Sequence, residues 1–204
     1  MSGTSQPRPK AGKVTQIVLT GFMGAGKTTA GMLAAERLRW RFVDIDRMVE
    51  ERAGMTVAAI FEQRGEAAFR EMEAAAIREA AVYEQVVMAL GGGAIERDET
   101  RAFLASLETC RVVYLEAPFD TLMARCAEQS GGAVRPVLRD RERLTARWQA
   151  RLPLYQQADA TVSTVDLAPE AVAEAVLAAA GVAAAESAPA GPQIRTGVNT
   201  EARA

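Results

Sequence analysis

The stretch Gly21-Phe22-Met23-Gly24-Ala25-Gly26-Lys27-Thr28 follows the pattern GxxxxGKT, with an apolar run at 17–19 before it and helical periodicity after it. In this strand–loop–helix setting, glycines let consecutive backbone N–H groups face one anion, and the dipole of the following helix attracts the same anion. Lys27 can then reach the β- and γ-phosphates of a nucleotide, and the Thr28 hydroxyl can ligate Mg²⁺. The stretch therefore predicts a nucleotide-binding P-loop rather than a chance glycine-rich turn.

Outward from this loop, short apolar runs alternate with longer helical segments. Several runs are continuously apolar, which is typical of strands buried on both faces. The alternation predicts a three-layer α/β/α fold with a parallel sheet, in which ligands bind at the carboxyl ends of the strands. The expected strands are 16–20, 41–44, 85–90, 111–115 and 161–165, and the expected helices are 27–38, 65–83, 98–106, 118–128, 140–151 and 169–180.

Composition changes at both ends of the 204-residue chain. Residues 1–13 carry prolines and lysines without the apolar centre of a signal peptide, and residues 181–204 are rich in Ala, Gly and polar residues without periodicity. We expect two disordered tails around one domain at 14–180. No apolar run reaches the ~18–20 residues of a membrane span, so we expect no membrane partner.

Charge and residue usage exclude several chemistries. A net charge of −2 provides no overall positive field for nucleic acid. Histidine is absent, which excludes histidine bases, His-bearing zinc sites and Ser-His-Asp triads. Cys110 and Cys126 form neither a CxxC motif nor a disulfide framework, so a reduced, cytoplasmic setting is expected. Lys27 is the only lysine of residues 14–180.

Asp44-Ile45-Asp46 follows the second expected strand. In extended backbone, residues i and i+2 share a face, so the two carboxylates would point the same way while Ile45 packs. One carboxylate could hold hydrated Mg²⁺, and the other could accept a proton from an alcohol. The alternative is an acidic pair at a helix start, with Asp46 capping residues 47–52, and the two interpretations are compatible.

Gly91-Gly92-Gly93 follows the third expected strand. Consecutive glycines let the backbone approach a ligand closely, although the run by itself is better explained as a flexible turn. No aspartate ends this strand, as one does in P-loop motor ATPases, which leaves Asp44 as the best candidate for the magnesium carboxylate. An Asn-Lys-x-Asp motif is also absent, which argues against a GTPase.

Arginines supply the remaining candidates. Arg70 and Glu73 are i,i+3 neighbours beside Phe69, an arrangement that fits a grip on a small carboxylate and fits a surface ion pair equally well. Arginines also recur every four residues at 135, 139, 143, 147 and 151, and the middle three are best explained as a solvated helix face. Arg135 follows a glycine pair, as expected of a closing lid that brings positive charge to a phosphoryl group.

Taken in order, these motifs resemble those of the shikimate kinases, small P-loop kinases related to the nucleoside monophosphate kinases. The resemblance spans about residues 14–180, and its most specific parts are GExxFRxxE at 65–73, the triple glycine and RPxL at 135–138. The other matching segments are GFMGAGKT at 21–28, DID at 44–46, VYL at 113–115 and RLPLY at 151–155. The resemblance implies a five-stranded parallel sheet in the order 2-3-1-4-5 and a mobile lid. It also implies transfer of the ATP γ-phosphoryl group to the 3-hydroxyl of shikimate, on the route to chorismate and aromatic amino acids.

The resemblance further implies roles for individual residues. Asp46 becomes the candidate base, assisted in catalysis by Lys27 and Arg135, and Glu73 orients Arg70. The residues implied to bind ATP are Gly24, Ala25, Gly26, Lys27, Thr28, Thr29 and Arg135. Those implied to bind shikimate are Asp46, Arg70, Gly91, Gly92, Gly93 and Arg151. Mg²⁺, bound with ATP, would be held by Thr28 and, through water, by Asp44.

The sequence departs from the family pattern at a few positions. Ile45 stands where the family often has Ser or Thr, Val137 replaces a common leucine, and residues 128–134 form a longer segment before Arg135. The longer segment leaves two candidates for covering adenine, Arg125 and the loop before Pro169.

The sequence leaves two alternatives to a shikimate kinase, a related gluconate kinase and a catalytically silent ATP-binding module. Arg70, Arg151 and the triple glycine favour a cyclic carboxylate as substrate, and the complete catalytic set argues against a silent module. We expect a monomer.

Overall fold

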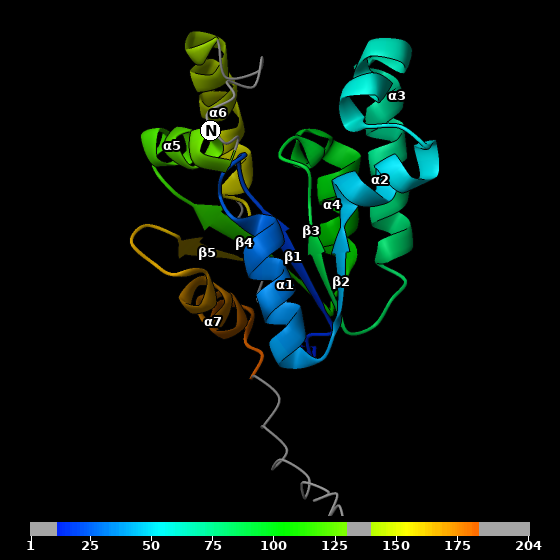
Figure 1. Ribbon diagram of the computed structural model, residues 1–204. Coiled ribbons are helices and arrows are strands. Elements are labelled where there is room, and N and C mark those ends of the chain that lie inside the picture. Colours follow the sequence, from blue (N-terminus) through cyan, green and yellow to red (C-terminus); the bar gives the residue numbers. More distant parts are fainter. Residues whose placement is uncertain (1–11, 130–139, 184–204) are drawn as a thin grey trace, which may run out of the picture.

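The computed structural model describes residues 12–129 and 140–183. Its sheet has five strands in the order β2-β3-β1-β4-β5, and every neighbouring pair is parallel, which confirms the predicted topology (Figure 1). The strands are β1 (Gln16–Thr20), β2 (Arg41–Asp44), β3 (Val86–Ala89), β4 (Cys110–Glu116) and β5 (Ala160–Ser163). The central strands β1 and β3 are buried along their whole length, as their continuously apolar sequences predict.

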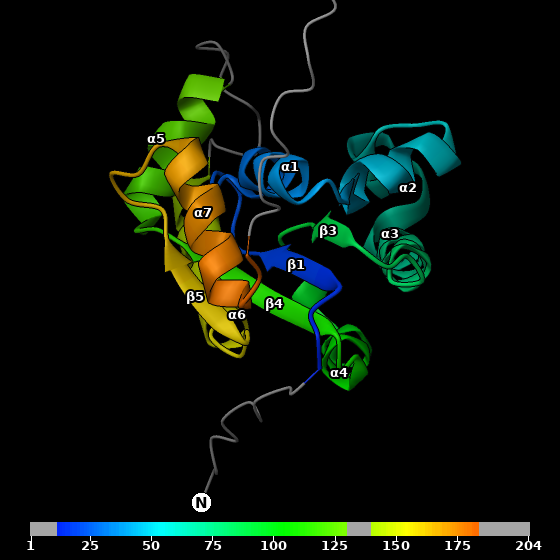
Figure 2. The same cartoon turned by 90° about the horizontal axis from the view of Figure 1, so that it is seen from below.

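Helices lie on both faces of the sheet, so the predicted three-layer arrangement is confirmed (Figure 2). The helices α1 (Lys27–Leu38) and α7 (Pro169–Ala180) lie side by side over one face, and α4 (Asp98–Ser106) packs on β4 across the other. The end of α6 (Arg141–Tyr155) shares that second face, because Tyr155 stacks on Tyr114 of β4 with ring centroids 5.1 Å apart. The remaining helices are α2 (Ile45–Ala53), α3 (Val57–Ala80), α5 (Phe119–Gln129) and the 3-10 turn η1 (Ala94–Glu96).

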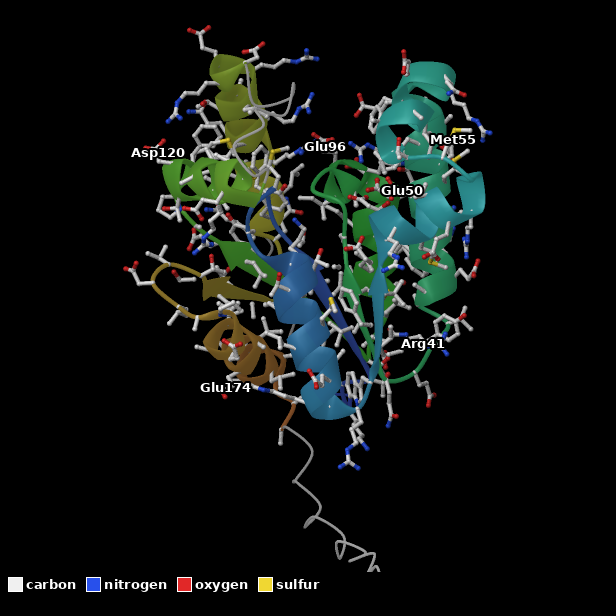
Figure 3. The ribbon with its side chains drawn as sticks, in the orientation of Figure 1. Arg41, Glu50, Met55, Glu96, Asp120 and Glu174 are labelled. Atoms are coloured by element: carbon white, nitrogen blue, oxygen red, sulfur yellow. The ribbon has the colours of Figure 1, made fainter. Side chains whose placement is uncertain are left out.

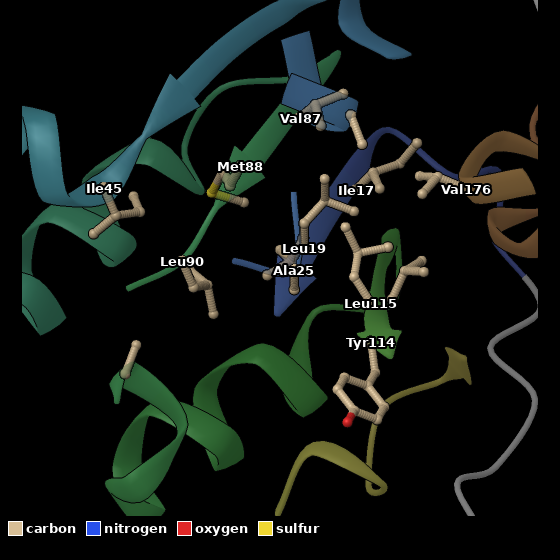
Figure 4. Packing of buried hydrophobic residues seen from close by; sticks show 14 of the residues in the cluster. Ile17, Leu19, Ala25, Ile45, Val87, Met88, Leu90, Tyr114, Leu115 and Val176 are labelled. Carbon is tan, nitrogen blue, oxygen red and sulfur yellow. The ribbon is translucent and has the colours of Figure 1, made fainter. Parts of the chain in front are cut away.

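The core forms where the strands meet α1 and α7 (Figure 4). Ile17, Leu19 and Val87 are fully buried there, and Val176 of α7 packs against the same cluster. Burial of this apolar surface, at ~25 cal/mol per Å², provides the main stabilising free energy of the fold. It also fixes the carboxyl ends of β1, β2 and β3 next to one another, where the candidate site lies.

The largest departure from the expected elements is α3. It consists of two helical segments joined at a kink. A segment that the sequence does not predict begins at Val57, where Thr56 accepts a hydrogen bond from the Ala59 N–H at 3.2 Å, and the predicted helix from residue 65 follows the kink and ends at Ala80 rather than at 83. Gly65 lies at the kink with φ 82° and ψ 168°, a non-helical conformation that glycine adopts readily and that separates the two segments.

The other differences are small. The predicted strands 85–90, 111–115 and 161–165 are Val86–Ala89, Cys110–Glu116 and Ala160–Ser163, and the predicted helices 118–128 and 140–151 are Phe119–Gln129 and Arg141–Tyr155. In the part of the chain that is described, no helix has both the length and the apolar character to cross a membrane. Arg135, Val137 and nearly all of the two predicted tails lie outside the described residues.

Candidate active site

The P-loop connects β1 to α1. Gly24 and Gly26 have φ of 77° and 85°, so the two turns of the loop need the left-handed conformation that glycine tolerates best. Gly26 is the N-cap of α1, whose first turn contains no acidic residue and, among the described residues, no capping side chain. The first N–H groups of α1 are therefore available to an anion, as the motif predicts.

The side chain of Lys27 folds back over this loop. Its Nζ donates hydrogen bonds to the carbonyl oxygens of Gly21, at 2.9 Å, and Phe22, at 3.0 Å. Burial lowers the pKa of Lys27 to about 8, against the opposing effect of the negative charges of Asp46 and Asp44. This lysine is thus held between the phosphate-binding backbone and the two aspartates.

Thr28 and Asp44 meet where α1 and β2 come together. The Thr28 hydroxyl donates to Asp44 Oδ2 at 2.8 Å, and Asp44 Oδ1 accepts from the Arg47 N–H at 3.3 Å. Asp44, not Asp46, is therefore the N-cap of α2. The predicted cap is wrong because the helix begins at Ile45, directly after β2, so that Asp46 already lies in its first turn and the two aspartates are not part of one extended segment. Ile45 is fully buried, as predicted, so its difference from Ser or Thr does not alter the surface of the site.

These two oxygen-bearing side chains fit a magnesium site. Mg²⁺ is usually held by one or two protein oxygens, together with substrate phosphates and water, rather than by a complete protein cage. Within residues 12–129 and 140–183 no cluster of three or more acidic or cysteine side chains could hold a metal by itself. Thr28, Asp44 and Asp46 line one common cavity of about 1060 Å³.

Asp46 lies in the first turn of α2 with an unusual environment. Its Oδ1 is buried and, within the described part of the chain, accepts no hydrogen bond. Burial, followed by the charge of Asp44, raises the pKa of Asp46, although Lys27 and Arg70 act in the opposite direction. A buried carboxylate oxygen with an unused lone pair is suited to accept a proton from a bound hydroxyl.

Arg70 and Glu73 form a buried ion pair on α3. Arg70 Nη1 lies 2.8 Å from Glu73 Oε2, and the two side chains are only 14% and 2% exposed. The alternative of a surface ion pair is therefore wrong. Burial raises the pKa of Glu73 to about 7, with Arg70 opposing the shift. Phe69 packs beneath, its ring centroid 5.2 Å from the guanidinium carbon.

The triple glycine passes directly beside these charged groups. A Cβ at position 91 would lie 2.5 Å from both Asp46 Oδ1 and Glu73 Oε1, and a Cβ at position 93 would overlap the guanidinium groups of Arg70 and Arg151. The run is thus a place of close approach between backbone and charged side chains, which the explanation as a flexible turn does not account for.

Arg151 approaches the same glycines from α6, and its residue is only 6% exposed. One helical turn further on, Tyr155 donates a hydrogen bond to the Gly92 carbonyl oxygen at 2.6 Å. The sequence interpretation assigned no role to Tyr155, although its i,i+4 spacing from Arg151 places the two on one helix face. The structure therefore brings Asp46, Arg70, Arg151 and the triple glycine together around one region.

Glu96 is a further residue of this region that the sequence interpretation missed. It ends η1, between α6 and α3 (Figure 3). Its Oε1 accepts from Arg151 Nε at 2.9 Å, its Oε2 accepts from Arg151 Nη2 at 3.2 Å, and Oε2 lies 3.6 Å from Arg70 Nη2. No local pattern predicts these contacts, because both partners lie on distant helices.

A separate cavity of about 260 Å³ opens on the other side of the P-loop. Arg125 lies at its edge and donates to Thr164 Oγ1 at 2.8 Å and to the Thr164 carbonyl oxygen at 2.6 Å. The structure thus brings together both sequence candidates for the adenine position. The residues that line the cavity are Gly24, Ala25, Gly26, Thr29, Ala30, Arg125, Thr164, Leu167, Pro169 and Val172.

Known proteins resemble this chain over most of its length. The family model described as Shikimate kinase matches residues 23–180. A curated shikimate kinase of Thermobifida fusca is 47% identical over 163 residues, which cover 78% of this chain and 91% of that protein. A curated shikimate kinase of Gloeobacter violaceus is 38% identical over 180 residues, covering 87% and 99% of the two chains.

Solved structures agree. The shikimate kinase from Acinetobacter baumannii in complex with shikimate has a TM-score of 0.73 to this fold, at 34% identity, over 80% of this chain and 91% of that one. The shikimate kinase from Bacteroides thetaiotaomicron has a TM-score of 0.72 at 32% identity, over 80% and 97%. This chain belongs to the shikimate kinase family of ATP-dependent kinases.

Proposed function

We propose that this protein transfers the γ-phosphoryl group of ATP to the 3-hydroxyl of shikimate, giving shikimate 3-phosphate and ADP. The observation that carries this proposal is the buried, unpartnered Oδ1 of Asp46, which lies among the described residues within electrostatic reach of both Lys27 and Arg70. A proton acceptor is thereby located between a phosphate-binding lysine and a carboxylate-binding arginine. The similarity to curated shikimate kinases supports the same substrate.

On the nucleotide side, the N–H groups of Gly24, Ala25 and Gly26 and of the first turn of α1 bind the β- and γ-phosphates. Lys27 exchanges its carbonyl partners for phosphate oxygens, and Thr29 faces the cavity where Arg125 and the loop before Pro169 cover adenine. Arg135 lies outside the described residues, and its role as a second cation on the transferred group remains a prediction from the sequence.

Thr28 and Asp44 hold Mg²⁺ in this proposal, Thr28 by its hydroxyl and Asp44 through water. When bound, the ion neutralises phosphate charge and orients the γ-phosphate. The Thr28–Asp44 hydrogen bond keeps both oxygens in place beforehand.

On the acceptor side, Arg70 and Arg151 bind the shikimate carboxylate, and Gly91, Gly92 and Gly93 let the backbone approach its ring. Glu73 keeps Arg70 in position through the 2.8 Å ion pair. As the bond from the 3-hydroxyl oxygen to the γ-phosphorus forms, the bond to the β–γ bridging oxygen breaks, and the hydroxyl proton passes to Asp46. Because the transition state is loose, positioning and charge stabilisation suffice and a carboxylate can act as base.

The remaining features of the proposal are those that the sequence predicts. The protein acts as a monomer in the cytoplasm, on the route to chorismate, through one domain at 14–180. It acts on neither nucleic acid nor membranes.

The proposal is tested by offering the purified protein ATP and Mg²⁺ with shikimate, with gluconate, or with nucleoside monophosphates. We expect ADP release with shikimate alone, and phosphorus NMR should locate the new phosphate on the 3-oxygen. ADP release with gluconate or a nucleoside monophosphate, without turnover of shikimate, would contradict the proposal.

A further inference from the structure

The carboxylate of Glu96 already occupies the positions that a carboxylate ligand of Arg70 and Arg151 would take. Arg151 presents its Nε and Nη2 to the two oxygens, at 2.9 Å and 3.2 Å, which is the paired geometry of arginine–carboxylate recognition. Arg70 Nη2 completes the arrangement at 3.6 Å from Oε2. η1 contacts both α3 and α6, so its last side chain reaches both arginines at once.

Arg70 thus lies beside two carboxylates, Glu73 and Glu96, and these differ in how firmly they are held. The Glu73 side chain is 2% exposed and lies one helical turn from Arg70 on the same helix, so it is enclosed in the protein interior beside its partner. Glu96 is 38% exposed and ends a three-residue turn, so its side chain can rotate into water. Because 38% of the Glu96 side chain is exposed to water, its pairing with the arginines removes only part of its hydration. Release from the arginines restores that part.

Glu96 is also anionic under ordinary conditions. Burial by itself would raise the pKa of its carboxyl, but the hydrogen bonds and charge of Arg151, and then the charge of Arg70, outweigh burial and lower the pKa. Arg151, whose side chain is 8% exposed, would otherwise be a buried cation without a carboxylate partner among the described residues. The fold therefore supplies an internal anion for this arginine.

We propose that Glu96 is a specificity-determining residue: it occupies the anion site of Arg70 and Arg151, and the substrate's carboxylate binds by displacing it. This inference rests on the proposed function and deepens it. Binding then exchanges one carboxylate for another, so the charge near the arginines stays balanced throughout. A ligand must bring a carboxylate of matching geometry to displace Glu96, which excludes neutral alcohols and weaker anions from the acceptor site.

The inference predicts that removing the charge of Glu96 strengthens binding of the substrate. Isothermal titration of shikimate, without nucleotide, should give a Kd about three- to tenfold lower for Glu96→Gln than for the wild-type protein. Glu99→Gln is the matched control, because Glu99 lies three residues away, is 70% exposed and pairs with Arg97 rather than with the two site arginines. Its Kd should stay within about twofold of wild type. An unchanged or higher Kd for Glu96→Gln, or an equal decrease for Glu99→Gln, would overturn the proposal.

A second measurement separates this inference from the identity of the substrate. In NMR spectra of the ligand-free protein, the Arg151 Nε–H signal, assigned through Arg151→Lys, should shift in Glu96→Gln and stay in place in Glu99→Gln. In the wild-type protein, shikimate should move the same signal. If shikimate binds none of the three proteins while the signal still depends on Glu96, the proposed substrate fails and the resident carboxylate stands. If the signal is insensitive to Glu96→Gln, the inference fails whatever the substrate.

Discussion

The nucleotide half of the site comes from one stretch of chain, residues 21–29, whereas the acceptor half draws on α2, α3, the turn after β3 and α6. In the proposed function the nucleotide half binds mainly through backbone N–H groups, and its Thr28 and Thr29 are exposed. The acceptor half uses buried charged side chains, with Glu73 and Arg151 at 1% and 6% exposure.

The two halves differ in the free-energy cost of leaving their polar groups without a ligand. Backbone N–H groups at a helix start can remain hydrated until a ligand arrives. A buried charge needs a partner at all times, because an unpaired one costs several kcal/mol. Hence the acceptor half contains the Arg70–Glu73 and Arg151–Glu96 pairs, and substitutions there should affect both stability and binding.

The largest effect is expected where the two halves meet, at Asp46. Asp46→Asn keeps the shape of the side chain and removes the proton acceptor, so kcat should fall by about 10³-fold, within the usual range for loss of a general base. A coupled ADP assay measures the rate, and titration with ATP should give an unchanged Kd. Asp98→Asn, at an exposed position, is the control. Retention of the wild-type rate by Asp46→Asn would show that the base is another group.

Lys27→Met should separate activity from stability on the nucleotide side. We expect kcat/KM for ATP to fall by about 10²–10³-fold, because the phosphates lose their buried cation. The free energy of unfolding should fall by less than about 1 kcal/mol, because burial of this lysine already disfavours its charged form. Lys13→Met, at an exposed position, should change neither quantity. A loss of stability as large as that expected for a broken buried ion pair would contradict the proposed difference between the two halves.

Arg70→Ala should weaken both substrate binding and the stability of the fold. The KM for shikimate should rise by about 10- to 100-fold with the KM for ATP within twofold, since a charge-assisted carboxylate contact is lost. Unfolding by urea should also show a loss of about 3 kcal/mol, because Glu73 is left buried without its partner. Arg97→Ala removes ion pairs with the exposed Glu71 and Glu99 and should change neither. An unchanged KM in Arg70→Ala would remove this arginine from the substrate site.

The smallest effect concerns the pH dependence of stability. The pKa of Glu73 is raised from 4.5 to about 7 in the folded protein, so between these values the folded state holds a proton that the unfolded state has lost. The free energy of unfolding should therefore fall as pH rises from 4.5 to 7, by up to about 3 kcal/mol from this residue. Glu73→Gln should flatten that slope, and Glu71→Gln, at an exposed position, should not. Equal slopes in Glu73→Gln and wild type would contradict the assignment.

Much of the fold could be predicted because its signals are local. Apolar runs mark β1 and β3. Pro169 and Gly181 mark the two ends of α7. The bounds of α1, α4 and α7 agree with the predicted ranges. The helical segment at 57–64 could not be predicted, because it is shorter than the window in which helical periodicity is recognised, whereas the helix after the Gly65 kink was expected. The helix α2 begins two residues before the predicted segment at 47–52, because an aspartate pair can follow extended backbone or open a helix equally well.

The candidate site likewise has a part that the sequence predicts and a part that only the tertiary structure shows. By itself the sequence determined the P-loop, because contiguous glycines and a helix start create an anion site from neighbouring backbone groups. It also supplied Asp46, Arg70 and Arg151 as candidates through the order of their motifs. Only the tertiary structure decided that the Arg70–Glu73 pair is buried, that Asp46 Oδ1 and Glu73 Oε1 converge on Gly91, and that Glu96 joins Arg70 to Arg151. Burial and contacts between distant helices depend on how the elements pack around the sheet, and no short stretch of sequence contains that information.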